Sequence, residues 1–266
     1  MSLAPGITYA FRRPRIVAIL PAFNEEDVIG SVIQHYLDDG VEVYLIDNCS
    51  TDGTAEIARQ WLGNGVIRIE RFPDDVGGTE RAKKEYMWGE ILRRNEVLAA
   101  ELGADWYIRA DADEFRVGPW PGMSHAEALT LVDALGFSAV QSQVLEFRPT
   151  DGGFPAGGDP RDHIHHYEPA EFANTLWVKA WKQPPVGVPV EIARTGGHAA
   201  SSPAAVSAPS TSSRCITRSA RPSMRSERSS RSGWSATPPK SATWAGTTTG
   251  TTSPPRPPTS YGTPPT

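Results

Sequence analysis

The chain has 266 residues and a formal net charge of -5, but its two ends differ sharply in composition. Residues 1–200 carry 18 Lys or Arg against 30 Asp or Glu, and residues 201–266 carry eight against one. The acidic larger part argues against general affinity for nucleic-acid phosphates, which requires a basic face. Ser, Thr and Pro fill 39 of the last 66 positions. This segment has too few apolar residues for their burial to offset the conformational entropy lost on folding.

We therefore expect a folded domain over residues 1–200 and a disordered tail over residues 201–266. Binding of nucleic acid by the basic tail is the less favoured alternative. The codons of a GC-rich gene read in the wrong frame also drift toward Arg, Ser, Pro and Thr, and the composition of this chain changes abruptly between Ala199 and Ser202. We hypothesise that a frameshift has replaced the natural C-terminus, which gene sequencing and mass spectrometry of the protein would test.

The cysteine content and the apolar runs bear on the compartment. Cys49 and Cys215 are the only cysteines, so the sequence implies no disulfide framework. No run of 18 apolar residues occurs, and the N-terminus lacks the apolar core of a signal peptide. From these features we expect a soluble cytoplasmic protein without a transmembrane segment.

Along the chain, apolar patterns predict strands and helices in alternation. Continuous apolar runs rich in β-branched residues predict strands at residues 15–20, 41–46, 66–71, 106–110, 138–147 and 176–181. Apolar residues at helical spacing predict helices at residues 25–40, 50–65, 79–102 and 124–135, the last with a capping box from Ser124 to Glu127. This alternation is typical of right-handed βαβ units and predicts an α/β fold with a mostly parallel central sheet flanked by helices.

Three polar segments follow predicted strands: "PAFNEED" after the first, "DNCSTDGT" after the second, and "DADE" after the strand that begins at Trp106. In open α/β sheets, ligands lie beyond the carboxyl ends of the strands. We therefore expect these three segments to form one binding site.

The same segments carry a family resemblance. The stretches "ILPAFNEEDVIGSVI", "YLIDNCSTDGTAEIA" and "RRNEVLAAELGADWYIRADADEF" resemble glycosyltransferase family 2 in order and spacing, over about residues 15–117 and more loosely to His198. The resemblance implies the GT-A fold. It also implies transfer of a sugar from a UDP-, GDP- or dTDP-linked donor to an unknown hydroxyl acceptor, with inversion at the anomeric carbon.

The resemblance also implies a set of residues that bind the nucleotide sugar. These residues are Pro21, Ala22, Asn24, Glu26, Asp47, Asn48, Arg94 and Asp111. Asp47 alternatively caps the next helix. Arg94 would bridge to the diphosphate, and its alternative is a solvated helix charge.

Three adjacent carboxylates follow the strand at Trp106, and they require either a cation or a solvated turn. Asp111 and Asp113 are two residues apart at a strand end, so both can face one Mg²⁺ or Mn²⁺ ion. The resemblance assigns Asp113 as the direct metal ligand and places Asp111 on the ribose or on the metal through water. It also suggests His198 as a further ligand, although a lone histidine is often a packed or surface residue.

The acceptor hydroxyl needs a general base. Our preference is Asp151, in a Gly-rich loop after a strand, with Glu191 next; the other acids considered are Glu146, Asp159, Asp162, Glu168 and Glu171. The "DHIHH" run at residues 162–166 favours a polar loop over a metal cluster. Two alternative functions remain: a nucleotidyltransferase of similar fold, and a catalytically impaired nucleotide-binding protein with a truncated acceptor half.

Overall fold

The computed structural model describes residues 12–147, 154–155, 157–169, 176–203 and 213–218, all within one compact unit, Met1–Arg225. The strands are β1 (Ile16–Ala22), β2 (Glu42–Asp47), β3 (Val66–Arg71), β4 (Trp106–Arg109), β5 (Glu114–Arg116), β6 (Ala139–Phe147), β7 (Tyr167–Pro169), β8 (Leu176–Lys182) and β9 (Ser213–Arg218). The α-helices are α1 (Ile29–Asp38), α2 (Thr54–Arg59), α3 (Val76–Ala82), α4 (Trp88–Glu101) and α5 (His125–Ala134). Short 3-10 helices cover Pro160–Asp162 and Ala193–Thr195.

The described strands form one mixed sheet in the order β3-β2-β1-β4-β8-β6-β9-β5, with β7 paired to β6. The first four strands of this order are parallel, with Ala22 opposite Asp47 and Ile19 opposite Arg109. This part confirms the expected α/β class and parallel order. Beyond β4 the sheet is mixed, because β8 runs antiparallel to both β4 and β6.

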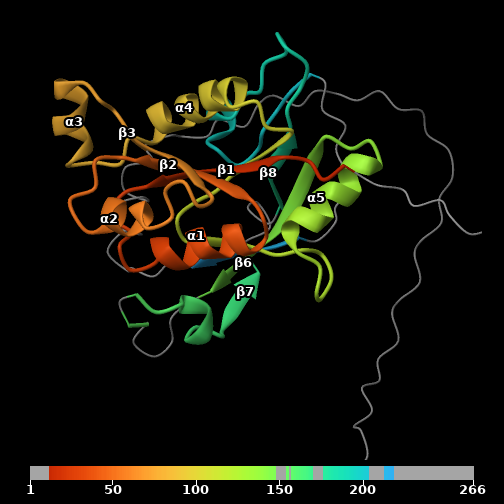
Figure 1. Cartoon of the computed structure of the whole chain (residues 1–266), viewed down its shortest axis with the longest axis horizontal. Coiled ribbons are helices and arrows are strands. Elements are labelled where there is room, and N and C mark those ends of the chain that lie inside the picture. Colours follow the sequence, from red (N-terminus) through yellow and green to blue (C-terminus); the bar gives the residue numbers. More distant parts are fainter. Residues whose placement is uncertain (1–11, 148–153, 156, 170–175, 204–212, 219–266) are drawn as a thin grey trace, which may run out of the picture. The chain divides into compact units, whose positions relative to one another are not determined.

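Helices cover the two faces of the parallel strands (Figure 1). Alternate residues of β1 divide between them: Ala18 and Leu20 belong to the apolar cluster that contains α1 and α5, and Val17 and Ile19 belong to the cluster that contains α4. Both sets are fully buried, as expected for a strand between two layers of helices. The carboxyl ends of β1, β2 and β4 therefore meet at one edge of the sheet.

The prediction of one continuous helix over residues 79–102 is wrong, because two separate helices, α3 and α4, occupy this region. Asp75 caps α3 by accepting from the Gly78 amide at 2.7 Å, earlier than the predicted start. The chain is not helical between α3 and α4, and there the Met87 amide donates a hydrogen bond to Asn48 Oδ1 at 2.9 Å. A tertiary hydrogen bond thus overrides a sequence of good helix formers.

Most of the predicted tail lies outside the described residues. Within it, β9 lies between β6 and β5, pairing parallel with one and antiparallel with the other. The domain boundary at residue 200 stays a prediction. In the part of the chain that the structure describes, no helix combines the length and the apolar character needed to cross a bilayer.

Candidate functional site

Two loops at the carboxyl edge are joined by reciprocal hydrogen bonds. Asn24 Oδ1, in the loop after β1, accepts from the Thr51 amide at 2.8 Å, and the Asn24 amide donates to Ser50 Oγ at 3.0 Å. Glu26 Oε2 accepts from the Gly53 amide at 2.8 Å. Asn24 has a φ of 56°, a left-handed conformation that asparagine tolerates better than most residues. Asn24 and Glu26 therefore fix the loop after β2, whatever they also contribute to a ligand.

The backbone at the end of β1 supports this arrangement. Pro21 and Ala22 are buried, and the Ala22 carbonyl accepts from the Asn48 amide at 2.9 Å. Asn48 itself is fully buried: its Nδ2 donates to the Phe72 carbonyl at 2.9 Å, and its Oδ1 accepts from the Met87 amide. Both polar atoms of this side chain are used within the protein, so the structure gives Asn48 a tethering role.

Asp47 is placed at the end of β2, 5% exposed. Its Oδ1 accepts from the Ser50 amide at 3.1 Å, within its own loop. Asp47 does not cap α2, because the N-cap residue of this helix is Gly53, which makes no side-chain cap hydrogen bond. Asp52 Oδ1 accepts from the amide of Thr54, the first residue of α2, at 3.0 Å. Asp47 is thus a nearly buried carboxylate at the expected edge of the sheet.

Arg94 lies on α4 and faces β3. Its guanidinium makes a bidentate pair with Glu70, at 2.8 Å and 3.1 Å, and Tyr44 donates to the same carboxylate at 2.5 Å. Burial, together with the hydrogen bond to Glu70, raises the pKa of Tyr44 to about 12. Arg94 is therefore neither a solvated helix charge nor an arginine that is open to a diphosphate in this state.

Asp111 follows β4 and is held by two cations. Arg109 donates to both of its carboxylate oxygens, at 2.6 Å and 3.1 Å, and Lys179 Nζ donates to Oδ2 at 2.8 Å. Burial alone would raise the pKa of Asp111, but Arg109 and Lys179 reverse this effect and hold it well below its ordinary value. Asp111 is therefore ionised and largely satisfied by protein donors.

Glu114, the third acid of "DADE", is fully buried and pairs with two cationic side chains. Arg116 donates to its Oε2 at 2.9 Å, and Lys179 contacts its Oε1. Lys179 consequently bridges Asp111 and Glu114. We call Arg109, Asp111, Glu114, Arg116 and Lys179 the ion cluster. Its members lie on β4, β5 and β8 and the turn between β4 and β5.

The three cations of the ion cluster were not identified from the sequence. A signal for them exists: Arg109 and Lys179 each interrupt an apolar strand, in "WYIRA" and "LWVKAW". Because side chains alternate along a strand, Lys179 must share a face with Trp177 and Trp181, and a charge at such a position requires a partner.

His198 lies beside the ion cluster. Its ring packs on Trp177 with 5.0 Å between ring centroids, and its carbonyl accepts from the Val178 amide at 3.0 Å. Burial lowers the pKa of the ring, and the charges of Lys179 and Arg109 lower it further, so the imidazole is neutral at pH 7. The preceding residue, Gly197, has a φ of 81°, and a Cβ there would lie 3.0 Å from the Arg109 guanidinium.

The ion cluster does not fit a metal bound directly by Asp111. Both oxygens of Asp111 already accept from Arg109, and one also accepts from Lys179. Among the described residues, no three His, Cys, Asp or Glu side chains are grouped so that they could hold a metal ion. Asp113 lies half-buried in the turn before β5. Ligation of Mg²⁺ or Mn²⁺ by Asp113 and His198 stays a prediction.

The choice of the general base stays a prediction for both preferred acids. Asp151 lies outside the described residues. Glu191 is exposed, and its described partners are Arg194, at 3.3 Å, and Ser201, through paired backbone hydrogen bonds. Its assignment also stays a prediction.

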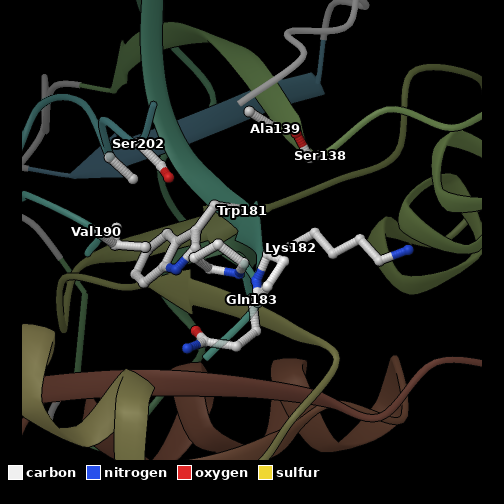
Figure 2. A pocket seen from close by; sticks show the side chains of 10 residues that line it. Ser138, Ala139, Trp181, Lys182, Gln183, Val190 and Ser202 are labelled. Atoms are coloured by element: carbon white, nitrogen blue, oxygen red, sulfur yellow. The ribbon is translucent and has the colours of Figure 1, made fainter. Parts of the chain in front are cut away.

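A cavity of about 370 Å³ lies at the other end of β8 (Figure 2). Trp181, Gln183, Val190 and Ser202 are among the residues that line it. Trp181 pairs with Tyr107 near the start of β4, so this cavity is at the opposite edge of the sheet from Asp111. It is not part of the candidate site.

The N-terminal part of the chain is similar to known proteins. The family model for glycosyl transferase family 2 matches residues 17–85, from β1 to just beyond α3. Protein RfbJ of Shigella flexneri is 28% identical over 101 residues, which cover 37% of this chain and 64% of RfbJ. The chain thus spans less than two thirds of the length of this relative.

Three solved structures are also similar in part. S. aureus TarS is 18% identical, with 53% of this chain and 38% of TarS covered and a TM-score of 0.31. The mannosyltransferase PcManGT from Pyrobaculum calidifontis, in complex with GDP-Man and Mn²⁺, is 23% identical, with 52% and 37% covered and a TM-score of 0.35.

The third is glucosyl-3-phosphoglycerate synthase from Mycobacterium tuberculosis, in complex with Mn²⁺, UDP and glucosyl-3-phosphoglycerate. It is 26% identical, with 49% and 44% covered and a TM-score of 0.33. The match to the family model covers β1, β2 and β3, so the loops after β1 and β2 lie in the part of the chain that is similar to glycosyl transferase family 2.

Proposed function

We propose that the chain transfers a sugar from a nucleotide diphosphate donor to a hydroxyl acceptor. One observation carries the proposal: the parallel strands β2, β1 and β4 bring the two joined loops and "DADE" to the same edge of the sheet. Two of the three segments lie within the matched family model, and the third follows the strand beside them.

The roles in the donor half follow from this arrangement. Asp47 is a nearly buried carboxylate that can accept from the imino group of a nucleobase. Pro21, Ala22 and the loop fixed by Asn24 and Glu26 would form the wall against the nucleoside. Asp111, ionised and held in place, would accept from a ribose hydroxyl through its exposed edge.

The reaction breaks the anomeric C–O bond of the donor and forms a bond from the same carbon to the acceptor oxygen. The nucleoside diphosphate leaves with the electron pair of the broken bond, and the acceptor loses its proton to a base. Asp151 and Glu191 remain the proposed bases. A cation would stabilise the departing diphosphate: either Mg²⁺ or Mn²⁺ held by Asp113 and His198, or a positive side chain of the ion cluster.

A panel of UDP-, GDP- and dTDP-sugars tests the proposal. Thermal unfolding with each compound should show a higher midpoint for one base, because a ligand that binds only the native state stabilises it by mass action. Asp47→Asn should lose most of that shift, whereas Glu56→Gln, an exposed residue on α2, should keep it.

Turnover separates the proposal from its alternatives. Release of nucleoside diphosphate from the stabilising donor supports glycosyl transfer. Binding without release under any acceptor or metal condition would favour a nucleotide-binding protein without catalysis. Release of pyrophosphate from a nucleoside triphosphate and a sugar phosphate would instead indicate a nucleotidyltransferase.

A further inference from the structure

We infer that Lys179 is the resident cation of the ion cluster: its ammonium group takes the place between Asp111 and Glu114 that a divalent metal would otherwise take. A nucleoside diphosphate can then bind beside Asp111 without a metal. The inference deepens the proposed function and rests on it for the nucleotide, but the statement about Lys179 and metals stands separately.

The contacts of Lys179 support this position. Its Nζ lies 2.8 Å from Asp111 Oδ2, contacts Glu114 Oε1 and lies 4.0 Å from the centre of the Trp177 ring. The Lys179 side chain is only 1% exposed. A buried ammonium between two carboxylate oxygens and an aromatic face is fully desolvated and strongly held.

The charges of the region balance with Lys179 in place. Arg109, Arg116 and Lys179 carry three positive charges, and the three acids of "DADE" carry three negative ones. An approaching diphosphate therefore meets no net repulsion from this group. Without Lys179 the group has a net charge of -1, which repels a diphosphate and favours a metal ion.

Removal of the Lys179 side chain should create a space that can bind a divalent metal ion. Asp111 Oδ2 and Glu114 Oε1 both face the Lys179 ammonium, so removal of the whole side chain leaves two carboxylate oxygens facing one space. Hard divalent cations prefer oxygen ligands and retain several waters. Lys179→Ala provides both the oxygens and the room, whereas Lys179→Met loses the same charge but fills the space.

The test measures Mn²⁺ binding and nucleoside diphosphate binding separately, by thermal unfolding and by calorimetric titration with UDP and GDP in EDTA or in Mn²⁺. For the wild-type chain we expect no shift with Mn²⁺ alone, and nucleotide affinity in EDTA within about twofold of that in Mn²⁺. Lys179→Ala should shift with Mn²⁺ alone, lose tenfold or more of its nucleotide affinity in EDTA, and recover it in Mn²⁺.

Two variants serve as controls. Lys179→Met should lose affinity in EDTA as Lys179→Ala does, but Mn²⁺ should not restore it. Lys182→Ala removes a half-exposed lysine from the same strand, where it pairs with Asp133, and should behave as the wild type does. A purely structural role of Lys179 would make the Ala and Met variants respond alike to Mn²⁺.

The inference is overturned if wild-type nucleotide binding requires Mn²⁺, or if the wild type binds Mn²⁺ alone and Glu114→Gln removes that binding. These wild-type measurements decide the question even if the Lys179 variants do not fold. If no nucleotide binds under any condition, the proposed function fails, while the response to Mn²⁺ alone still tests Lys179.

Discussion

The loops after β1 and β2 and the ion cluster after β4 hold their polar side chains in opposite ways. In the loops, Asn24 and Glu26 accept hydrogen bonds from backbone amides of the neighbouring loop. In the ion cluster, Asp111 and Glu114 are held by the charges of other side chains. Hydrogen bonds to backbone amides thus hold the two loops in place, whereas ion pairs between side chains hold the cluster. Different substitutions should therefore destabilise the two regions.

The largest effect should come from removing one charge of the cluster. Glu114→Leu leaves Arg116 and Lys179 buried without their shared acid, and we expect a loss of about 3–5 kcal/mol in the free energy of unfolding. Urea unfolding measures it. Glu56→Ala, which removes an exposed partner of Arg59, should cost less than about 1 kcal/mol. Equal costs for the two variants would contradict a cluster held by buried charge.

The cluster should also respond to acid. The folded-state pKa of Asp111 is lowered, so the unfolded chain takes up a proton first as the pH falls. The stability that Asp111 contributes is therefore complete above the unfolded pKa of about 4 and is lost as the pH falls further. Asp111→Asn should show a smaller loss of stability between pH 4 and pH 3 than the wild type, as measured by urea midpoints. Parallel curves for the two proteins would disprove this contribution.

The loops should respond to backbone conformation. Asn24→Ala removes the acceptor for the Thr51 amide and places a Cβ residue at positive φ without a compensating side chain, which together should cost about 1–3 kcal/mol. Asn24→Gly relieves the φ but not the lost bond, so it should cost less. Chemical denaturation of both variants tests the order, and a glycine variant as unstable as the alanine variant would argue against strain at this position.

The smallest effect should come from the exposed end of the same loop. Glu26→Ala loses the bond from the Gly53 amide and should cost about 0.5–1.5 kcal/mol. Glu26→Gln keeps an acceptor oxygen and should cost almost nothing. If the glutamine variant were instead as unstable as the alanine variant, charge would matter in the loops as well.

The parallel part of the fold could be predicted because its signal is local. The run "VIRIER" predicted a strand at residues 66–71, and β3 spans the same residues. The capping box from Ser124 to Glu127 is present at the start of α5, with the Glu127 amide donating to Ser124 Oγ at 3.1 Å. Period, cap and β-branched content all lie within a few neighbouring residues.

The break between α3 and α4 and the ion cluster could not be predicted, because both depend on contacts between segments that are distant in the sequence. The break between α3 and α4 is fixed by Asn48, 39 residues away from its partner Met87. The strand β5 has the sequence Glu-Phe-Arg, whose charges indicate a solvated turn until Lys179, 65 residues later, is placed beside Glu114. The sequence indicated that the acids of "DADE" require a cation, but not that the chain itself provides it.

Gly197 gives the segment before residue 200 a part in the chemistry of Asp111. Its backbone passes over the Arg109 guanidinium so closely that a Cβ would lie within 3.0 Å of it, and the neighbouring residues pair with Val178. This crossing shields Arg109 from water, where its attraction for Asp111 would be several times weaker. A chain that ended before this crossing would keep the parallel strands β3, β2, β1 and β4, but the ion pair between Arg109 and Asp111 would be exposed to water and weaker.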